Sequence, residues 1–391
     1  MKHLAGLLIF LSVISCAPGA HAGSGEVAPE NTLALITLPP QWTETYTREP
    51  TLPEPTDTDT PVPTVTPTPA PTFTKTPTAT YYSGPMEFEK IRTLNAGEPI
   101  VGVDYQPILQ RLISISATGN VRLYDAVQGD RLLNKKIDSS GWAGVALDPY
   151  GEFFILGLRD RIEIRNAQTT EVVHSIREGI RNVKGISFFA SKGILAVAVE
   201  NGLQLFSNLS GRASDIPRRS ADSLFMEATT RPVFNPDGTE LGFGGLYNGE
   251  PALEIEYLDA CSEGICFNGG ESGNVFGGYG TIADLQFSKE GGLAVVSGGS
   301  IAVLDASRTD VRNHIEVRNP LHIALAGEDH LLVAGTADGR LILMRFPSLE
   351  IIVNIPAHQG KINQLIYSGV DGVMVTAGED GKINLWTIAR K

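Results

Sequence analysis

The chain has 391 residues and a formal net charge of −13, with 42 glycines and 7% aromatic residues. The negative balance argues against a nucleic-acid partner, because phosphate binding needs clustered Lys and Arg, and it argues equally against a basic patch for anionic lipids. Abundant glycine with few aromatic residues favours a turn-rich β protein over a helical one.

An apolar run at residues 4–14 follows a single lysine and is too short to span a bilayer as a helix. It is typical of a secretory signal, and two endings fit it. Val13-Ile14-Ser15-Cys16 resembles a bacterial lipobox, whereas Ala20-His21-Ala22 resembles an ordinary cleavage site. Because the cysteine stands directly at the end of the apolar run, we expect residues 1–16 to be a lipoprotein signal peptide with Cys16 as the lipidated residue.

The segment 17–85 has no apolar period, and Pro and Thr dominate it between residues 39 and 80. No core forms without such a period, so we expect a disordered linker. Pro-rich chains extend at about 3.1 Å per residue, so this stretch is long enough to hold a domain on the order of 100 Å from its anchor. Thr-Pro repeats are also typical of O-glycosylated stalks, although a plain spacer is sufficient to explain the composition.

From residue 86 to the last residue, a strand signature recurs roughly every forty residues. Its seven copies are NVRLYDA (120–126), RIEIRNA (161–167), GLQLFSN (202–208), LEIEYLDA (253–260), SIAVLDA (300–306), RLILMRF (340–346) and KINLWTI (382–388). Turns such as NPDG and apolar runs such as ILAVAV precede them. Four-stranded units of this kind bury both faces only when they stack radially, so the sequence predicts an all-β, seven-bladed β-propeller.

The last unit has three strands before the chain ends, and its missing outer strand is available near the other end. The segment EFEKIRTL, at residues 87–94, has the length and composition of a strand. We therefore expect this N-terminal strand to close the last blade, which makes residues 86–391 one domain that is intolerant of losing either terminus.

Two cysteines other than Cys16 stand close together, Cys261 and Cys266 in DACSEGICF. An exported compartment permits a local disulfide between them, and a ring this small contributes roughly 2 kcal/mol. Two buried thiols are the alternative. The spacing is not a zinc pattern, and no His or Cys pair is placed to complete one.

The final repeat, AHQGKINQLIYSGVDGVMVTAGEDGKINLWTI at 357–388, consists of three short apolar strands separated by Gly- and Asp-containing turns. It resembles one repeat of the WD-repeat propeller family. The motif positions are occupied by Ala357-His358, Val370-Asp371-Gly372, Asp380-Gly381 and Trp386-Thr387. The resemblance implies a structural hydrogen-bonded network inside the blade. Its members are His358, Thr376, Asp380 and Trp386. The match fades in the other repeats, so another seven-bladed propeller, such as the quinone type, stays open.

In a propeller of this family, the loops that lead into inner strands share a face with the loops between second and third strands. Two such loops are long here, 244–252 in the fourth blade and 268–281 leading into the fifth, and the disulfide would lie on the opposite face. Loops on a rigid scaffold concentrate binding residues, and exposed aromatics are favoured anchors. A glycine-rich insertion without a role is the alternative. The candidate binding residues are Tyr247, Asn248, Glu250, Asn274, Phe276 and Tyr279.

Local catalytic signatures are missing from the sequence: it has no HExxH, no Gly-x-Ser-x-Gly and no phosphate-binding P-loop. GGYG at 277–280 resembles a fragment of a dinucleotide fingerprint but lacks the spacing. We therefore expect no catalytic residues, no metal and no cofactor. Propeller glycosidases and lactonases use scattered carboxylates, so the lack of a motif is a weak argument against catalysis.

We interpret the chain as a non-enzymatic, extracytoplasmic binding or scaffold module. In this interpretation a lipid anchor holds a monomeric propeller, whose loop face binds a protein or glycan partner of the cell envelope. The alternative is a secreted, glycosidase- or lactonase-like hydrolase with its site at the central opening. Two clustered carboxylates or a metal at the axis would favour the hydrolase, and small or apolar residues there would disfavour it. A purely structural envelope component is a third alternative.

Overall fold

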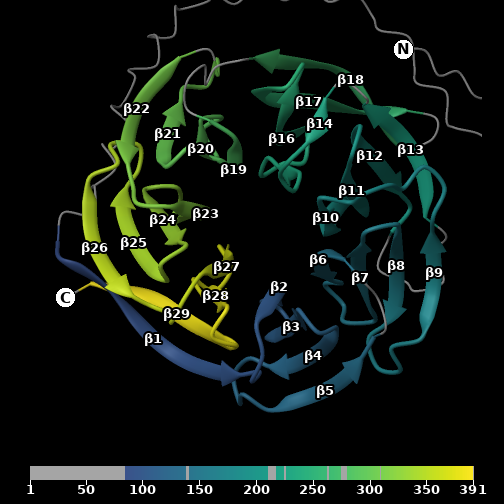
Figure 1. Cartoon of the computed structure of the whole chain (residues 1–391), viewed down its shortest axis with the longest axis horizontal. Coiled ribbons are helices and arrows are strands. Elements are labelled where there is room, and N and C mark those ends of the chain that lie inside the picture. The colour runs from purple at the N-terminus through teal and green to yellow at the C-terminus, as the bar shows by residue number, and fades with distance from the viewer. Residues whose placement is uncertain are drawn as a thin grey trace, which may run out of the picture. The chain divides into compact units, whose positions relative to one another are not determined.

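The computed structural model describes residues 84–390, except 138–140, 210–216, 224–225, 262–263, 274–279 and 309. Within that part, the strands form seven antiparallel sheets, which surround a common axis as blades (Figure 1). The predicted all-β, seven-bladed β-propeller is therefore confirmed. The expected signal peptide with Cys16 and nearly all of the expected linker lie outside the described residues.

Blades one to three each consist of four consecutive strands, ordered from the axis outward. Their bounds are β2 (Ile100–Gln106), β3 (Arg111–Ser116), β4 (Asn120–Asp125) and β5 (Arg131–Lys136); β6 (Trp142–Leu147), β7 (Phe153–Leu158), β8 (Arg161–Asn166) and β9 (Val172–Ile176); and β10 (Gly185–Phe189), β11 (Ile194–Val199), β12 (Gly202–Ser207) and β13 (Arg218–Ser223). A short 3₁₀ helix, η1 (Ala190–Lys192), lies in the turn between β10 and β11.

Blades five and six repeat this plan, blade four has five strands, and blade seven combines strands from both ends of the propeller. Their bounds are β14 (Glu227–Ala228), β15 (Val233–Phe234), β16 (Glu240–Tyr247), β17 (Glu250–Cys261) and β18 (Gly264–Gly273); β19 (Ile282–Phe287), β20 (Leu293–Ser297), β21 (Ser300–Leu304) and β22 (Val311–Glu316); β23 (Pro320–Ala326), β24 (Leu331–Thr336), β25 (Arg340–Arg345) and β26 (Ile351–Pro356); and β27 (Ile362–Tyr367), β28 (Met374–Gly378), β29 (Lys382–Arg390) and β1 (Met86–Asn95).

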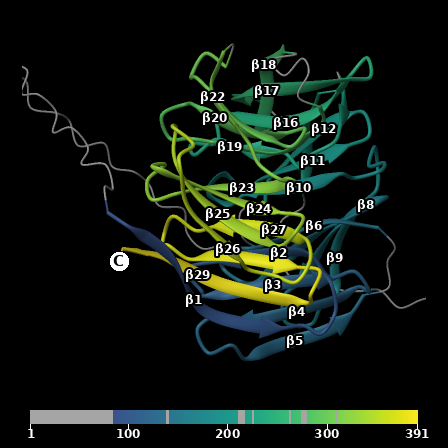
Figure 2. The ribbon, with the colours of Figure 1, turned by 60° about the vertical axis from the view of Figure 1, so that its left-hand side comes forward.

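The ring closes by pairing β1 with β29 in blade seven. The two strands are antiparallel, with Met86 opposite Arg390 and Asn95 opposite Lys382. Figure 2 shows them side by side along one edge of the propeller. β1 also covers the indole of Trp386, because the Phe88 ring packs edge-on against it with centroids 6.3 Å apart. The outer strand of the last blade thus comes from the segment that precedes blade one.

The core is divided among the interfaces between neighbouring blades. Seven clusters of buried apolar side chains lie in the described part, one between each pair of blades. Second strands such as β7, β11 and β24 are buried along their whole length because both of their faces meet another blade. Outer strands such as β26 alternate between exposed and partly buried residues, because only one of their faces is covered.

The inner strands of five blades share a β-bulge near their first residue. The residues directly after the bulge are Gly102, Gly144, Asp284, His322 and Gln364. A bulge re-aims the side chain beside it, and in blades one, two and five that position faces the next blade. At Gly144 a Cβ atom would lie 3.1 Å from Ile186 of blade three, so glycine allows the inner strands to approach closely.

Blade four departs from this plan because its inner strand is interrupted. β14 and β15 both pair with β16, and Pro232 lies between them. Proline has no backbone N–H to donate to a ladder, so the pairing breaks there and resumes at Val233.

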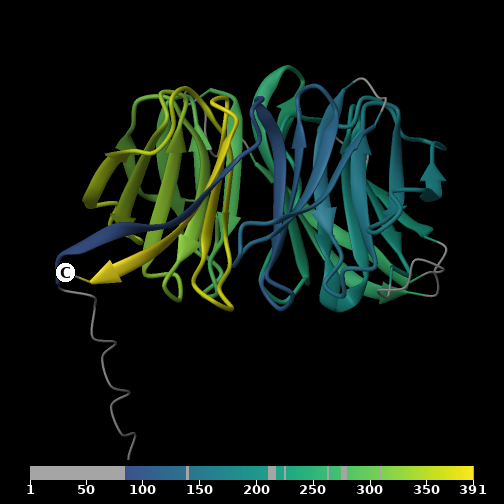
Figure 3. The same cartoon turned by 90° about the horizontal axis from the view of Figure 1, so that it is seen from below.

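The propeller has two faces. The upper face is the one at which the inner strands begin, and the lower face is the one at which they end. The upper face carries the turn at 247–250. In Figure 3, β29 ends and β1 begins at the lower face, toward the bottom of the view.

Candidate functional site

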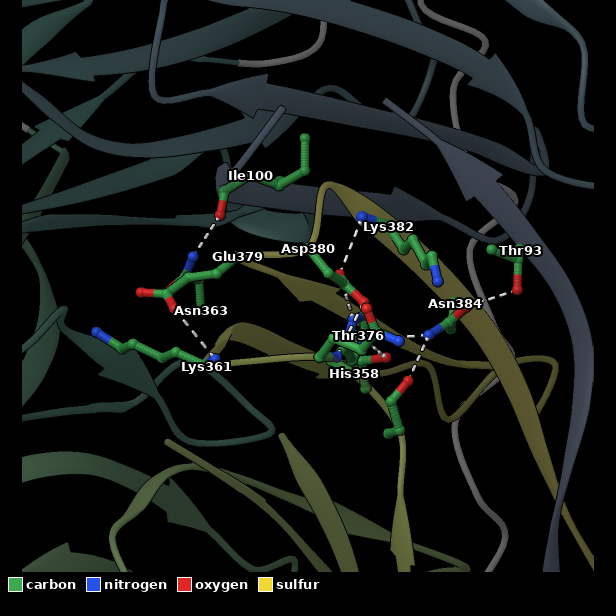
Figure 4. A network of polar contacts seen from close by, with 12 residues as sticks. Thr93, Ile100, His358, Lys361, Asn363, Thr376, Glu379, Asp380, Lys382 and Asn384 are labelled. Carbon is green, nitrogen blue, oxygen red and sulfur yellow. Dashed lines mark hydrogen bonds and ion pairs between the residues drawn. The ribbon is translucent and has the colours of Figure 1, made fainter. Parts of the chain in front are cut away.

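Four side chains form a continuous chain of hydrogen bonds at the upper end of blade seven, and Asn384 Nδ2 joins it at 3.2 Å from His358 Nε2. His358 Nδ1 lies 2.9 Å from Asp380 Oδ1, and His358 Nε2 lies 2.8 Å from Thr376 Oγ1 (Figure 4). Trp386 Nε1 donates to the same hydroxyl oxygen at 3.0 Å. These are the residues that the family resemblance assigns to this network. They tie the entry of the inner strand β27 to the turn between β28 and β29.

The protonation of this network follows from its donors. Thr376 Oγ1 accepts the indole N–H, so its own O–H donates to His358 Nε2, and the Nδ1–H then donates to Asp380. Burial lowers the pKa of His358 and outweighs the neighbouring carboxylate. Burial alone would raise the pKa of Asp380, but the His358 bond and two backbone N–H groups hold it below its usual value. A neutral imidazole with both ring nitrogens engaged is a structural element.

Blade one ties its upper turns with different side chains. Glu98 lies before β2 and is bonded by Thr118, Asn120 and Arg122 around the turn between β3 and β4. Burial alone would raise the pKa of Glu98, but these partners lower it to about 2. A partly exposed carboxylate thus ties the upper turns of blade one, as the histidine does in blade seven.

The prediction of a long loop at 244–252 is wrong. These residues belong to β16 and β17, and Tyr247 pairs directly with Glu250 across a two-residue turn. Asn248 and Gly249 have φ angles of +53° and +83°, as a tight Asn-Gly hairpin turn requires. The glycines that suggested a loop serve close packing instead, since a Cβ on Gly244 would lie 2.5 Å from Ile282.

Three predicted binding residues therefore share one rigid hairpin tip at the upper face of blade four. Tyr247, Asn248 and Glu250 lie at this tip, and Tyr247 is 48% exposed. The second predicted loop, 268–281, also begins as a strand, because residues 268–273 belong to β18. The predicted residues Asn274, Phe276 and Tyr279 lie outside the described residues.

Three charged side chains that the sequence analysis did not select form a row across the inner strands of blades four, five and six. Arg231 Nε lies 3.5 Å from Asp284 Oδ1, and His322 Nδ1 lies 3.5 Å from Asp284 Oδ2. Asp284 is buried, whereas Arg231 and His322 are partly exposed. Asp284 and His322 directly follow the bulges in β19 and β23, and Arg231 stands beside the Pro232 interruption.

Both axial carboxylates in this region accept backbone hydrogen bonds on each oxygen. Asp284 accepts the N–H of Leu285 at 3.0 Å and that of Ile323, in the next blade, at 3.1 Å. Asp104 on β2 likewise accepts the N–H of Tyr105 at 2.9 Å and that of Leu147, in the next blade, at 2.7 Å. Each carboxylate therefore links one inner strand to the next.

The two carboxyl groups differ in the direction of their pKa shifts. Burial alone would raise the pKa of Asp284, but Arg231 and His322 hold it below its usual value. Burial raises the pKa of Asp104 to about 6, although its backbone hydrogen bonds and Arg231 act in the opposite direction. The row is therefore anchored by an ionised aspartate beside a partly exposed imidazole.

Three further observations concern the cysteines, metal ligands and membrane-spanning helices. Cys261 and Cys266 form a disulfide with a Cα–Cα distance of 5.9 Å, at the lower-face turn between β17 and β18. No group of three or more His, Cys, Asp or Glu in the described part of the chain is placed to hold a metal ion. No helix among the described residues has the length and apolar character needed to cross a bilayer.

Comparison with known proteins gives a short and partial similarity. No family model matches the chain. Over 85 residues it is 35% identical to guanine nucleotide-exchange factor SEC12 of Mus musculus, which is 21% of this chain and 19% of that protein. Over 59 residues it is 39% identical to SEC12 of Rattus norvegicus, covering 15% and 14%. The chain thus spans less than a fifth of either relative, and the similarity supports the WD-repeat-like propeller alone.

Proposed function

We propose that this protein is a non-enzymatic binding or scaffold module of the cell envelope. A lipid on Cys16 holds it outside the cytoplasmic membrane, and the upper face of its propeller binds a protein or glycan partner. The apolar run that ends in Val13-Ile14-Ser15-Cys16 supports the anchor. The Pro- and Thr-rich segment supplies the reach between anchor and propeller.

The hairpin tip of blade four carries the binding proposal. Tyr247 is 48% exposed at the end of two paired strands, and a turn with two left-handed residues holds it in place. A rigid exposed tyrosine contributes contact area at low entropic cost. Asn248 and Glu250 beside it supply polar groups for a protein backbone or a sugar hydroxyl.

The axial carboxylates support binding over hydrolysis. A glycosidase needs two carboxyl groups that face one substrate bond. Asp104 and Asp284 instead each accept two backbone N–H groups, which commits both oxygens to holding adjacent blades together. The neighbouring bulge positions of blades one and two carry glycine.

One observation favours the hydrolase as a second candidate. His322 Nδ1 faces the ionised Asp284 at 3.5 Å, the relation by which a carboxylate orients a general-base imidazole. His322→Gln would abolish hydrolysis if this pair were catalytic and would leave the binding of an envelope partner unchanged. The exchange activity in the name of SEC12 is not carried over, because the matched region is a small part of that protein.

Crosslinking of the full-length protein in intact envelopes tests the binding proposal. The wild type is compared with Tyr247→Ala and with Ile91→Ala, which truncates a similarly exposed large side chain on the outer strand β1. We expect one crosslinked species that Tyr247→Ala removes and Ile91→Ala retains. If every crosslinked species of the wild type survives Tyr247→Ala, the upper-face site is refuted.

The anchor has its own test. Cys16→Ser is expected to move the protein from the membrane fraction to the soluble fraction after cell breakage. Ser15→Ala, next to it, keeps the cysteine and serves as the control. Continued sedimentation of the Cys16→Ser protein with membranes would show that the lipobox assignment is wrong.

A further inference from the structure

The lower face exposes apolar side chains at the same turn in three consecutive blades. This turn joins the inner strand to the second strand. Val370 in blade seven is 76% exposed, Ile108 in blade one is 75% exposed and Tyr150 in blade two is 68% exposed. Single exposed apolar residues are ordinary on protein surfaces, but a contiguous group marks an interaction site.

Direct contacts show that these turns are neighbours. Tyr105 at the end of β2 donates its hydroxyl to Asp371 Oδ2 at 2.6 Å, which joins blade one to the turn that carries Val370. A Cβ on Gly151 would lie 2.8 Å from Leu109 Cδ1, so the turn of blade two touches that of blade one. The three turns are therefore held next to one another, and each presents one exposed apolar side chain at the lower face.

The same chain of contacts continues into blade six. The N–H of Gly327 donates to Tyr367 Oη at 3.4 Å, which joins the lower turn of blade six to the inner strand of blade seven. Asp329 beside it accepts the N–H of Lys289 in blade five. The lower turns of blades five, six, seven, one and two are thus linked in sequence around the ring.

A pocket of about 290 Å³ opens at the lower face between blades five and six. Leu304 and Phe346 contribute apolar walls. Four carboxylates line it, against one guanidinium, that of Arg312, and one imidazole, that of His330. The carboxylates are Glu290, Asp305, Glu328 and Asp329. Apolar walls with a carboxylate rim match a long cationic side chain, whose methylene stem packs on the walls while its head meets the rim.

The negative charge around the pocket discriminates among three possible binding partners of this face: a bilayer, a second copy of this chain and another protein. An anionic bilayer surface would be repelled by the carboxylates around the pocket. A second copy of this chain, docked through the same face about a two-fold axis, would place identical carboxylate rims against each other, in a protein whose net charge is already −13. A partner with alternating basic and apolar side chains complements both the exposed apolar side chains and the carboxylate-lined pocket.

We propose that the lower face of blades five, six, seven, one and two docks a basic, amphipathic segment of a partner protein. Its apolar side chains lie on Ile108, Tyr150 and Val370, and one Lys or Arg side chain enters the pocket beside Glu328. This site is separate from the Tyr247 tip on the opposite face. Either site can therefore fail experimentally without affecting the other.

Fluorescence anisotropy on the full-length protein tests the proposal. The probe is a short labelled peptide of alternating Leu and Lys, and the matched probes are a Leu/Glu and a Ser/Lys peptide. We expect measurable binding of the Leu/Lys peptide alone. The affinity should fall as salt rises, because screening weakens the contacts with the pocket. Equal binding of the Leu/Glu peptide would overturn the assignment of a basic partner.

Variants then locate the binding surface. Ile108→Ser combined with Val370→Ser, and separately Glu328→Lys, are each expected to weaken Leu/Lys binding about tenfold, the effect of losing a hot-spot contact. Two exposed controls away from the surface, Val101→Ser at the upper end of β2 and Glu200→Lys at the upper face, should bind as the wild type does. Unchanged binding by the surface variants would refute the site, since these exposed positions are replaced without loss of folding.

Two more measurements test the alternative binding partners, a membrane and a second copy of this chain. Flotation with phosphatidylcholine vesicles that the wild type binds and the Ile108/Val370 variant does not would assign the surface to a membrane instead. Sedimentation showing a dimer that the same variant dissociates would assign it to a second copy. Either result overturns the proposal.

Discussion

Blades seven and four order their strands from the axis outward in the same way, but they differ in whether their buried polar groups have hydrogen-bond partners. In blade seven each polar atom of the network meets a complementary partner, from Trp386 through Thr376 and His358 to Asp380. In blade four, β17 buries Glu254 and Glu256 two residues apart on one face. Glu254 Oε2 has no partner among the described residues.

The acidic pair changes the protonation of blade four. Burial raises the pKa of Glu254 to about 7, and the charge and hydrogen bond of Glu256 add to that effect. The opposite face of β17 carries Leu253 and Ile255, which pack in the cluster between blades four and five. Blades four and seven therefore share apolar packing against their neighbours, although their buried polar groups differ.

The largest expected effect comes from opening blade seven. Deleting residues 87–94 removes most of β1, exposes Trp386 and leaves the hydrogen-bonding edge of β29 unpaired. We expect a loss on the order of 5 kcal/mol or more, comparable with the whole stability of a domain. Thermal unfolding measures it. A deletion of equal length inside residues 39–80 is the control, and equal melting temperatures for the two deletions would contradict the closure of the ring by β1.

Next in size is the loss of the blade-seven network. Thr376→Val keeps the side-chain shape but leaves the Trp386 N–H without its partner and leaves His358 Nε2 with Asn384 alone, at a cost of about 2 kcal/mol in the free energy of unfolding. Urea denaturation measures it. Ser297→Ala in blade five, which removes one hydrogen bond to Gly280, should cost about 1 kcal/mol. Similar costs for both variants would mean that the network is no more than a set of single bonds.

The acidic pair of blade four is expected to make stability depend on pH. The folded-state pKa of Glu254, about 7, exceeds its ordinary value of 4.5. Its stabilising contribution is therefore complete below pH 4.5 and is lost as the pH rises through 7. Glu254→Gln should remove this loss and become more stable than the wild type above pH 7 by on the order of 2 kcal/mol.

Melting temperatures between pH 5 and pH 8 measure this difference, in a window set by the folded-state pKa of Glu254 near 7. Asp104, with a pKa raised to about 6, titrates in the same range, but it does so in both proteins and cancels in the comparison. Glu200→Gln, at an exposed site, is the control. Parallel profiles of melting temperature against pH for wild type and Glu254→Gln would show that the pKa of Glu254 is not raised on folding.

The contribution of blade seven to stability depends on pH in the opposite direction. The lowered pKa values of His358 and Asp380 make this blade lose stability as the pH falls.

The smallest effect concerns the disulfide at the lower edge of blade four. Replacing Cys261 and Cys266 together by serine opens a small ring and should cost about 2 kcal/mol at most, because short loops lose little entropy on closure. Thermal unfolding with and without reductant measures it. A reductant effect in the double-serine protein would point to a cause other than this bond.

Much of the fold was accessible from local sequence patterns. Alternating β-branched residues and Gly- or Asp-containing turns repeat within each blade, so the blade count and the closing strand followed from short-range signals. The Asn248-Gly249 turn was also a local signal, but Gly244 and Gly245 beside it suggested a loop. The need for glycine at these two positions comes from tertiary packing. Gly244 lies against Ile282 of the next blade, and Gly245 lies against the backbone of Glu227.

By itself the sequence determined the all-β repeat architecture, the polar network of the last repeat and the pairing of two nearby cysteines, because each depends on residues within one blade or one turn. Only the tertiary structure decided the Arg231–Asp284–His322 row, the facing of Asp104 toward blade two and the continuous lower surface of five blades. These features join residues of different blades. Their contacts depend on bulge positions and blade order, which leave no trace in local composition.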